Sequence, residues 1–200
     1  MLAIQTKHPE NSPHDARVRP ILLLLVGASG SGKTTFYETH LKTAFPTLLK
    51  GSASPLEQTE ADQERKRLMK RGKSFVYQDV VFDPRLIRAA KSVGFEVKAV
   101  YVATEDPTLN LGCVLIRVSN GGPFAPILRI PQDYRHGLKQ LPEVKKLADD
   151  LMLFDNTPHG RGIRLIAHFR GRELVKLSRT RPKWAQKAFG KDSTWLKPSS

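Results

Sequence analysis

ILLLLVGASGSGKT, residues 21–34, decides the fold of this chain. Its first six residues are apolar without a break, a run too short for a helix and typical of a strand buried on both faces of a parallel sheet. The last eight match the pattern G-x-x-x-x-G-K-[ST] of a phosphate-binding loop, or P-loop. Residues 34–44 read as the helix that must follow such a loop, and Pro46 ends it.

Each residue type in the loop has a chemical reason. Glycines let successive backbone N–H groups curve around an anion, and the helix that follows adds a partial positive charge. Lys33 is predicted to reach the β- and γ-phosphates of ATP, and the Thr34 hydroxyl to ligate Mg²⁺. A Gly/Ser-rich loop that fits by chance is the alternative, and the strand–helix context disfavours it. The predicted nucleotide-binding residues are Gly27, Ala28, Ser29, Gly30, Ser31, Gly32, Lys33, Thr34 and Thr35.

Strands and helices alternate along the rest of the chain. Apolar and Val-rich runs predict strands over residues 74–79, 95–103 and 151–155, and a hairpin over 163–169 and 173–177. Helices are predicted over 55–71, 83–93 and 106–119, the last two opened by the cap signals Asp83-Pro84 and Asp106-Pro107. Because parallel strands need long connections, the expected fold is α/β, a doubly wound and mostly parallel sheet of P-loop nucleotide-kinase type with helical additions.

Length and composition favour one domain. The 200 residues are predicted to form a flexible arm (1–19), a P-loop domain (20–190) and a basic tail (191–200). No apolar run is long enough to span a membrane, and no secretory signal opens the chain, so a cytoplasmic address is expected. The single cysteine, Cys113, falls in a predicted helix and is expected to be a buried structural thiol. Six phenylalanines on apolar faces are expected in the core: Phe36, Phe45, Phe75, Phe82, Phe95 and Phe154.

The chain carries a formal net charge of +14, which predicts an anionic partner. From residue 156 to the end there are eleven Lys or Arg against two acidic residues, so much of the excess lies there. With Trp184 and Trp195 interleaved, this part predicts either a nucleic-acid-binding face with stacking platforms, a docking face for an acidic protein, or a solubilising tail.

Three segments beyond the P-loop resemble the zeta-toxin family. Residues 72–84 resemble its strand ending in Glu-Thr, and residues 94–122, with Arg117-Val118-Ser119-Asn120-Gly121-Gly122, its Arg-Val-x-x-Gly-Gly-His element. The third segment, Phe154-Asp155-Asn156-Thr157, is similar to its late Asp-Asn-Ser; it is taken together with Pro182-Lys183-Trp184, which is similar to a Pro-x-Trp near the end. The resemblance extends over residues 20–185. It implies an ATP- and Mg²⁺-dependent kinase of a small molecule, in the best-known branch UDP-N-acetylglucosamine, and a toxin held by an antitoxin.

The resemblance also implies a role for Arg117, and the context of the P-loop predicts one for Asp79. Arg117 would neutralise charge on the transferred phosphoryl group, the alternative being a solvated helix-face arginine. Asp79, at the end of a buried strand, is the candidate for the magnesium shell, the alternative being a solvated turn or N-cap residue. The predicted catalytic set is therefore Lys33, Arg117 and Asp79, with Thr34 and Asp79 on the metal.

The chain departs from the family pattern at four places. Residues 39–56 contain no Asp or Glu where the family has its proton acceptor, and Gln78 stands in place of the family's Glu. Pro123 replaces the histidine after the glycine pair, and Asp133 the second arginine, which Arg129 or Arg135 could supply from one turn away. Two functions stay open: a kinase that phosphorylates a nucleotide sugar or another small molecule, and a nucleotide-binding protein without transfer activity that acts through its basic C-terminal face on nucleic acid or an acidic partner.

Overall fold

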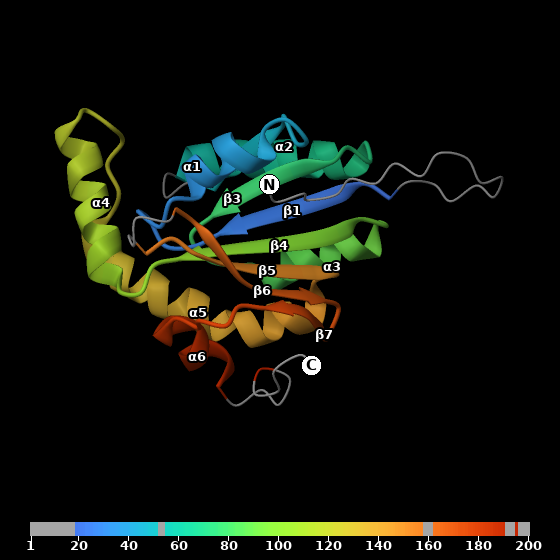
Figure 1. The fold of residues 1–200 in the computed structure, drawn as a ribbon. Helices are drawn as coiled ribbons and strands as arrows, with labels where there is room; N and C mark the ends of the chain where they lie inside the picture. The colour runs from blue at the N-terminus through green and yellow to red at the C-terminus, as the bar shows by residue number, and fades with distance from the viewer. Residues whose placement is uncertain (1–18, 52–54, 158–161, 191–194, 196–200) are drawn as a thin grey trace.

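A computed structural model describes residues 19–51, 55–157, 162–190 and 195 (Figure 1). The predicted arm therefore lies outside the described residues except for Arg19, and the predicted tail except for Trp195. The strands are β1 (Ile21–Val26), β2 (Leu48–Lys50), β3 (Phe75–Asp79), β4 (Glu96–Ala103), β5 (Asp150–Asp155), β6 (Arg164–Arg170) and β7 (Glu173–Leu177). The helical elements are α1 (Lys33–Phe36), η1 (Tyr37–Leu41), α2 (Pro55–Lys70), α3 (Pro84–Ser92), α4 (Pro107–Ser119), η2 (Ile127–Arg129), α5 (Ile130–Leu147) and α6 (Lys183–Phe189).

The seven strands form one sheet in the order β2-β3-β1-β4-β5-β6-β7. The first five are parallel, and β6 and β7 continue the sheet as an antiparallel hairpin. β1 lies between β3 and β4, and its residues from Leu22 to Val26 are at most 2 % exposed. The predicted α/β fold with a mostly parallel sheet is confirmed, and β1 is the central strand that its unbroken apolar run requires.

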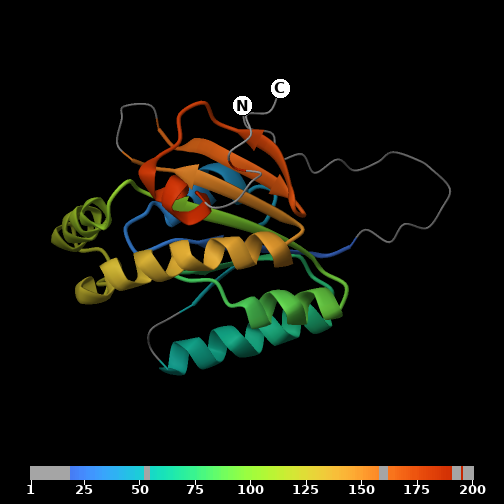
Figure 2. The ribbon, with the colours of Figure 1, turned by 90° about the horizontal axis from the view of Figure 1, so that it is seen from below.

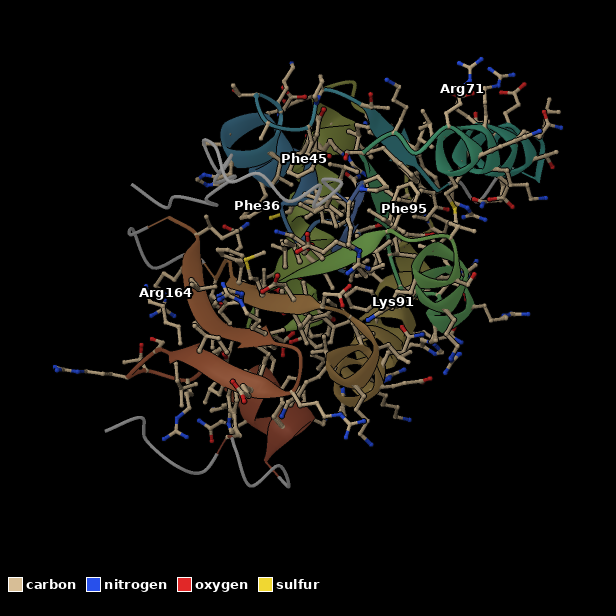
Figure 3. The ribbon with its side chains drawn as sticks, turned by 90° about the vertical axis from the view of Figure 1, so that its right-hand side faces the viewer. Phe36, Phe45, Arg71, Lys91, Phe95 and Arg164 are labelled. Atoms are coloured by element: carbon tan, nitrogen blue, oxygen red, sulfur yellow. The ribbon has the colours of Figure 1, made fainter. Side chains whose placement is uncertain are left out.

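Helices cover both faces of the sheet. Alternate β1 residues divide between two cores: Leu22, Leu24 and Val26 face one, and Leu23 and Leu25 face the other. The α1–η1 segment covers the second face, while α2, α3 and α5 run along the first (Figure 2). All six phenylalanines predicted for the core are buried. Figure 3 labels Phe36 and Phe45, which belong to the core on the second face of the sheet, and the exposed Arg71, which points outward.

The local signals fix several element boundaries. The Asp83 side chain accepts a hydrogen bond from the Arg85 N–H at 2.9 Å, and Asp106 accepts one from the Thr108 N–H at 2.7 Å. Both N-caps are as the sequence predicts, because a carboxylate here satisfies an N–H that the helix leaves unpaired.

Other elements differ from expectation. The predicted helix over 34–44 is a single α-turn followed by a π-helical turn, η1. Among the described residues, β2, η2, α5 and α6 were not predicted from local patterns. α5 contains Pro131 in its first turn and Pro142 in its interior, which obscured an apolar series at Tyr134, Leu138 and Leu141. Burial of that face against the sheet keeps the helix continuous in spite of the missing N–H of Pro142.

No described helix combines the length and the apolar character that a membrane crossing requires.

Candidate functional site

The P-loop connects β1 to α1 at the end of the sheet where the parallel strands terminate, and α4 stands across this end (Figure 1). Gly30 and Gly32 have φ of +81° and +97°, a region that favours glycine. A Cβ at Gly30 would lie 2.1 Å from the Asn110 carbonyl oxygen, and one at Gly32 would lie 2.2 Å from Asn156 Nδ2. The loop is therefore enclosed by α4 on one side and by the residue after β5 on another, which leaves no space for side chains at these two positions.

Two asparagine side chains hold the loop in place. Asn110 Nδ2 donates to the Ser29 carbonyl oxygen at 3.1 Å, and Asn156 Nδ2 donates to the Ser31 carbonyl oxygen at 2.9 Å. Asn110 is fully buried, and its Oδ1 accepts a hydrogen bond from the Thr104 hydroxyl. Both asparagines stand in the segments that resemble the zeta-toxin family, but the sequence alone assigned neither a role. Only their contacts with the P-loop reveal the function they share, which is to fix the loop backbone.

The side chain of Lys33 is buried against the P-loop backbone. Its Nζ donates to the carbonyl oxygens of Gly27 at 2.5 Å and Ala28 at 3.1 Å. The pKa of Lys33 is lowered to about 8, chiefly by burial; the charge of Asp79 opposes this shift, the charge of Arg117 adds to it, and the charge of Asp133 opposes it. The structure thus brings the three residues predicted as catalytic into one electrostatic neighbourhood and adds Asp133 from the first turn of α5.

Asp79 ends β3 directly beside the last residue of β1. Val26 and Asp79 are partners in the parallel register of the two strands, so the carboxyl group lies at the same sheet edge as the P-loop. Asp79 Oδ1 accepts from the Val80 N–H at 2.6 Å. Burial raises the pKa of Asp79, although that hydrogen bond, one from Tyr77 and the charge of Lys33 oppose the rise. The helix that follows is capped by Asp83, so Asp79 is not its N-cap residue.

Gln78 takes the other face of the strand. Because neighbouring strand residues alternate, its side chain lies opposite that of Asp79. Gln78 is paired with Leu25 in the sheet, and its side-chain oxygen is buried without a hydrogen-bond partner. The Asp79 carboxylate and the Gln78 side chain therefore lie on opposite faces of β3, so Asp79 does not occupy the place of the glutamate that Gln78 replaces.

Arg117 lies in the last turn of α4 and is partly buried. The Gly122 N–H donates to the Arg117 carbonyl oxygen at 2.9 Å, and a Cβ at Gly122 would lie 2.6 Å from Arg117 Cγ. Glycine at 122 thus gives the arginine side chain its space, which is a physical reason for the spacing of the two residues. Arg117 Nε is buried and has no hydrogen-bond partner, so the guanidinium keeps donor capacity for an anion.

The positions discussed for a second arginine do not form part of this group. Arg129 is exposed and lies 4.0 Å from the Asp133 carboxylate, while Arg135 is exposed and forms no described ion pair. Asp133 itself is largely enclosed, with its side chain 15 % exposed. Position 133, where the resemblance leads one to expect an arginine, therefore holds a carboxylate, and its charge raises the pKa of Lys33.

A pocket of about 450 Å³ opens beside the P-loop. Its walls are Gly30, the first turns of α4, and the chain just after β5; among its lining residues are Leu109, Cys113, Ile116 and Asn156. Cys113 is exposed at this pocket, so the prediction of a buried structural thiol is wrong. The error has a simple cause, since α4 projects from the end of the sheet and buries only one of its faces.

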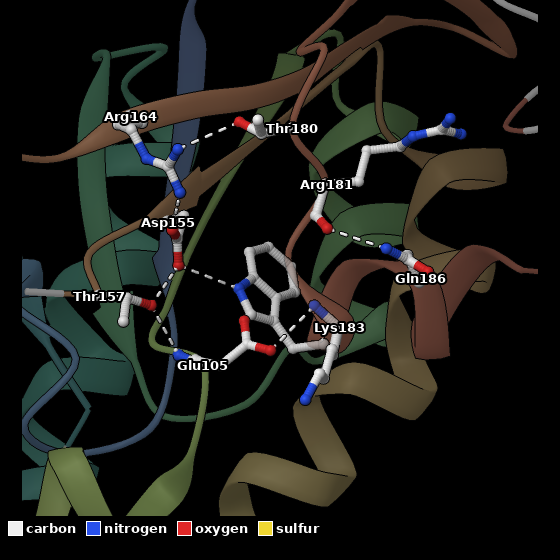
Figure 4. Close-up of polar contacts among 9 residues, drawn as sticks. Glu105, Asp155, Thr157, Arg164, Thr180, Arg181, Lys183 and Gln186 are labelled. Carbon is white, nitrogen blue, oxygen red and sulfur yellow. Dashed lines mark hydrogen bonds and ion pairs between the residues drawn. The ribbon is translucent and has the colours of Figure 1, made fainter. Parts of the chain in front are cut away.

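Asp155 ties this end of the sheet together (Figure 4). The carboxylate is 1 % exposed and accepts hydrogen bonds from Thr157 Oγ1 at 2.6 Å, Arg164 at 2.5 Å and Trp184 Nε1 at 3.2 Å. Thr157 Oγ1 in turn accepts from the Glu105 N–H at 2.8 Å, just before α4. With both carboxylate oxygens engaged, Asp155 has a structural role: it fixes the position of Asn156 and the base of α4.

The tryptophans proposed as stacking platforms are not on the surface. Trp184 and Trp195 are 2 % and 1 % exposed. Trp195 stacks on Phe189 with ring centroids 5.4 Å apart, and Trp184 donates to Asp155. The alternative in which they stack with nucleic-acid bases is wrong, because both rings lie in the core: Trp184 packs on Tyr101 of β4, and Trp195 packs on Phe169 of β6 and Phe189 of α6.

Carboxylate and hydroxyl oxygens suit Mg²⁺, which commonly takes one or two protein ligands beside substrate phosphates. Thr34 offers an exposed hydroxyl directly after Lys33, and Asp79 offers a carboxylate at the adjacent strand end. This donor set fits a nucleotide-bound magnesium ion. It does not fit a metal held by protein alone, since no group of three or more His, Cys, Asp or Glu suited to one ion occurs among the described residues.

No protein-family model matches the sequence, and no curated protein does either. Solved structures do resemble it. A chain of the AvrRxo1-ORF1:AvrRxo1-ORF2 complex crystallised with ATP has a TM-score of 0.66 at 15 % identity, covering 91 % of this chain and 66 % of its own length. The same complex in its native form gives 0.64 at 16 % identity, over 89 % and 65 %. A protein of Chloroflexus aurantiacus described as a candidate kinase gives 0.53 at 16 % identity, over 72 % and 91 %.

This chain spans slightly less than two thirds of the length of the AvrRxo1-ORF1:AvrRxo1-ORF2 chain. At these identities the likeness concerns the fold alone. The chain therefore shares its α/β fold, a mostly parallel sheet with helices on both faces, with these solved structures.

Proposed function

We propose that this protein is an ATP-dependent phosphotransferase that moves the γ-phosphoryl group of MgATP to a hydroxyl group of a small molecule. The observation that carries the proposal is that Asp79 ends the strand paired with the last residue of β1, at the sheet edge where the P-loop holds Lys33. The charges of Asp79 and Arg117 both act on Lys33. A lysine for the phosphates, a carboxylate for the metal shell and an arginine for the transferred group are the parts that phosphoryl transfer needs. The ATP-containing structural neighbour supports ATP as the nucleotide.

Each residue has a task in this proposal. The P-loop N–H groups and Lys33 bind the β- and γ-phosphates, and Lys33 exchanges its carbonyl partners for phosphate oxygens. Arg117 directs its unpaired guanidinium N–H groups to the phosphoryl group that moves. Thr34 and Asp79 would hold Mg²⁺, which neutralises phosphate charge when it is bound.

A proton acceptor for the substrate hydroxyl is absent from residues 39–56, where the zeta-toxin pattern has one. We assign the task to Asp133, a second carboxylate whose charge acts on Lys33. Its substitution by Asn should lower kcat and leave the ATP dissociation constant unchanged. Arg129→Ala removes the exposed ion-pair partner of Asp133 at 4.0 Å and is the matched control, with a smaller effect expected on kcat.

The pocket beside Gly30 is the proposed seat of the nucleobase. It adjoins the phosphate-binding loop, and Leu109 and Ile116 give it apolar surface suited to an aromatic ring. The acceptor is proposed to be a nucleotide sugar, UDP-N-acetylglucosamine being the first to test. An acidic antitoxin is the proposed protein partner, in keeping with the net charge of +14 and with the two-component complex of the structural neighbour.

The test is transfer of label from γ-labelled ATP, with Mg²⁺, into UDP-N-acetylglucosamine and into a pooled small-molecule extract. Lys33→Ala should abolish the labelled product, whereas Lys42→Ala, which removes an exposed lysine paired with Glu38, should not. If the wild-type protein binds ATP and labels nothing, the kinase proposal fails. Salt-sensitive binding to RNA or DNA would then favour the nucleotide-binding alternative that acts through the basic C-terminal face.

A further inference from the structure

The Tyr77 hydroxyl and the Asp79 carboxyl group lie side by side on one face of β3. Residues two apart in a strand point to the same side, so the phenol ring extends along the strand toward the carboxylate. Both groups pack against Gly51, the residue after β2: a Cβ there would lie 2.6 Å from Asp79 Oδ2 and 3.0 Å from the Tyr77 hydroxyl oxygen. The Gly51 N–H also donates to the Gln78 carbonyl oxygen at 2.8 Å, which fixes this close approach.

The hydrogen bonds of Tyr77 have a direction. Gln58 Nε2 on α2 donates to the Tyr77 hydroxyl oxygen at 3.3 Å and to Asp62 Oδ1 at 2.8 Å. An amide nitrogen only donates, so the hydroxyl accepts from Gln58 and keeps its own proton for another acceptor. The Asp79 carboxylate is placed to accept that proton, because its Oδ2 and the Tyr77 hydroxyl oxygen both pack against the Gly51 Cβ position. In keeping with this, Tyr77 is one of the groups that oppose the rise in the pKa of Asp79 that burial causes.

The ring of Tyr77 is itself held from α2. The Arg65 guanidinium lies over the ring, 5.1 Å from its centroid, and pairs with Asp62 at 3.1 Å. Tyr77 is 4 % exposed, so the ring has little freedom to turn. A chain of contacts therefore runs from α2 through the Tyr77 hydroxyl to the carboxylate at the P-loop.

We propose that Tyr77 is a positioning residue that fixes the Asp79 carboxylate for nucleotide-bound Mg²⁺ and couples it to α2 through Gln58. The inference rests on the proposed function in one respect, the assignment of Asp79 to the metal shell. It goes further in assigning a role to a residue outside the P-loop and the predicted catalytic set. It also makes α2 part of the nucleotide site, although no α2 residue was among the predicted site residues.

The test is calorimetric and needs no turnover. ATP affinity is measured with Mg²⁺ and with a chelator, and the gain in affinity due to Mg²⁺ is compared between proteins. Tyr77→Phe keeps the ring beneath Arg65 and removes only the hydroxyl. The dissociation constant of this variant for metal-free ATP should stay within about twofold of the wild-type value. The gain in ATP affinity due to Mg²⁺ should fall about tenfold, because the loss of one hydrogen bond to a charged group has an effect of this size. Asp79→Asn should lose at least as much.

Two further variants keep the test decisive. Gln58→Ala removes the donor on α2 without touching the sheet and should reduce the gain in the same direction, by about threefold. Tyr37→Phe removes a buried hydroxyl that bonds the Phe45 carbonyl oxygen at 3.0 Å and should leave the gain unchanged.

An unchanged gain in Tyr77→Phe overturns the inference, and so does an unchanged gain in Asp79→Asn or the absence of any gain in the wild-type protein. Failure of the proposed phosphotransferase function is a separate result. It would appear as absence of labelled product while the wild-type protein still shows a Mg²⁺-dependent gain in ATP affinity.

Discussion

Asn156 Nδ2 donates a hydrogen bond to the Ser31 carbonyl oxygen at 2.9 Å, although the two residues are 125 positions apart in the chain. Ser31 belongs to the P-loop, and Asn156 follows β5, two strands away from β1 in the sheet. The bond is short because Gly32 has no side chain to keep the amide away. The phosphate-binding loop is thus shaped from outside as well as by its own glycines.

Loss of this bond should weaken nucleotide binding. Asn156→Ala leaves the Ser31 carbonyl oxygen without its partner and lets the loop relax, so we expect the ATP dissociation constant to rise about fivefold, or ~1 kcal/mol. Isothermal titration calorimetry measures it. Asn120→Ala, an exposed asparagine beyond α4, is the control and should bind ATP as wild type does. Equal affinities for Asn156→Ala and wild type would show that the loop holds its shape alone.

Gly30→Ala should destabilise the protein and abolish ATP binding. A methyl group there meets the Asn110 carbonyl oxygen at 2.1 Å in addition to the unfavourable positive φ. We expect a loss of roughly 3 kcal/mol in the free energy of unfolding, from strain of ~1 kcal/mol and overpacking of ~2 kcal/mol. Gly171→Ala is the matched control, because Gly171 also has positive φ, at 56°, but no atom within 4 Å of its Cβ position. Denaturant unfolding that gives equal losses for both variants would contradict the predicted collision.

Metal-free ATP affinity should fall as the pH rises through 8. Burial lowers the pKa of Lys33 to about 8 from 10.5, so the ammonium loses its proton there unless phosphate retains it. Above that pH the dissociation constant should rise by up to about tenfold per pH unit. Titrations from one unit below to one unit above pH 8 measure the effect, and Lys33→Met should remove the dependence. A flat wild-type profile would mean that Lys33 does not contact the phosphates.

The same pKa predicts the pH dependence of stability. Between pH 8 and 10.5 the unfolded protein keeps a proton on this lysine that the folded protein has lost, so Lys33 makes the free energy of unfolding rise with pH in that window. Chemical denaturation of the wild-type and Lys33→Met proteins across the window should show the rise in the first and its loss in the second.

Arg117→Ala should reduce kcat for the proposed phosphoryl transfer about a hundredfold or more. The guanidinium is proposed to neutralise the negative charge of the transferred phosphoryl group, so ATP affinity should change little. Gly122→Ala should also lower kcat, but less. A Cβ at position 122 would lie 2.6 Å from Arg117 Cγ, so the arginine side chain would have to move away from it. Arg135→Ala, which removes an exposed arginine of α5, should leave kcat unchanged. If Arg117→Ala has the same kcat as the wild-type protein, Arg117 is a solvated arginine on the face of α4 with no part in catalysis.

The exposed thiol of Cys113 offers a direct test of the proposed nucleobase pocket. Cys113 is the only cysteine of the chain, it is exposed, and it lines the pocket beside Gly30. ATP should therefore slow alkylation of Cys113 by N-ethylmaleimide about tenfold at saturation, whereas inorganic triphosphate, which has no base, should not. Mass spectrometry of the labelled protein follows the reaction. Equal protection by both ligands would place the nucleobase elsewhere.

The sequence predicted much of this fold because its strongest signals are local. An unbroken apolar run makes β1 a central strand, a G-x-x-x-x-G-K-T spacing makes the P-loop, and Asp83 and Asp106 cap the helices they precede. Signals of this kind depend on backbone sterics and hydrogen bonds within a few residues. α5 was missed for the same reason, since Pro131 and Pro142 weaken the local helix signal that tertiary packing overrides.

The site was only partly predictable. Lys33 and the P-loop follow from their motif, and the proximity of Asp79 follows from the end of a strand adjacent to β1. The sequence predicted a buried Cys113, which is exposed, and left open exposed stacking roles for Trp184 and Trp195, which are buried. The sequence of a helix does not show which of its faces is buried, because burial depends on which other elements the helix packs against in the folded protein.

By itself, the sequence determined a phosphate-binding loop after a buried central strand, and with it the class of the fold. Only the tertiary structure decided that Asn110 and Asn156 hold the backbone of that loop, that the charges of Arg117 and Asp133 act on Lys33, and that Tyr77 and Asp79 pack together against Gly51. Most of these residues are separated from the loop by tens of residues or more, and the order of the strands in the sheet sets their distances. Side-chain periodicity along one segment carries no information about that order.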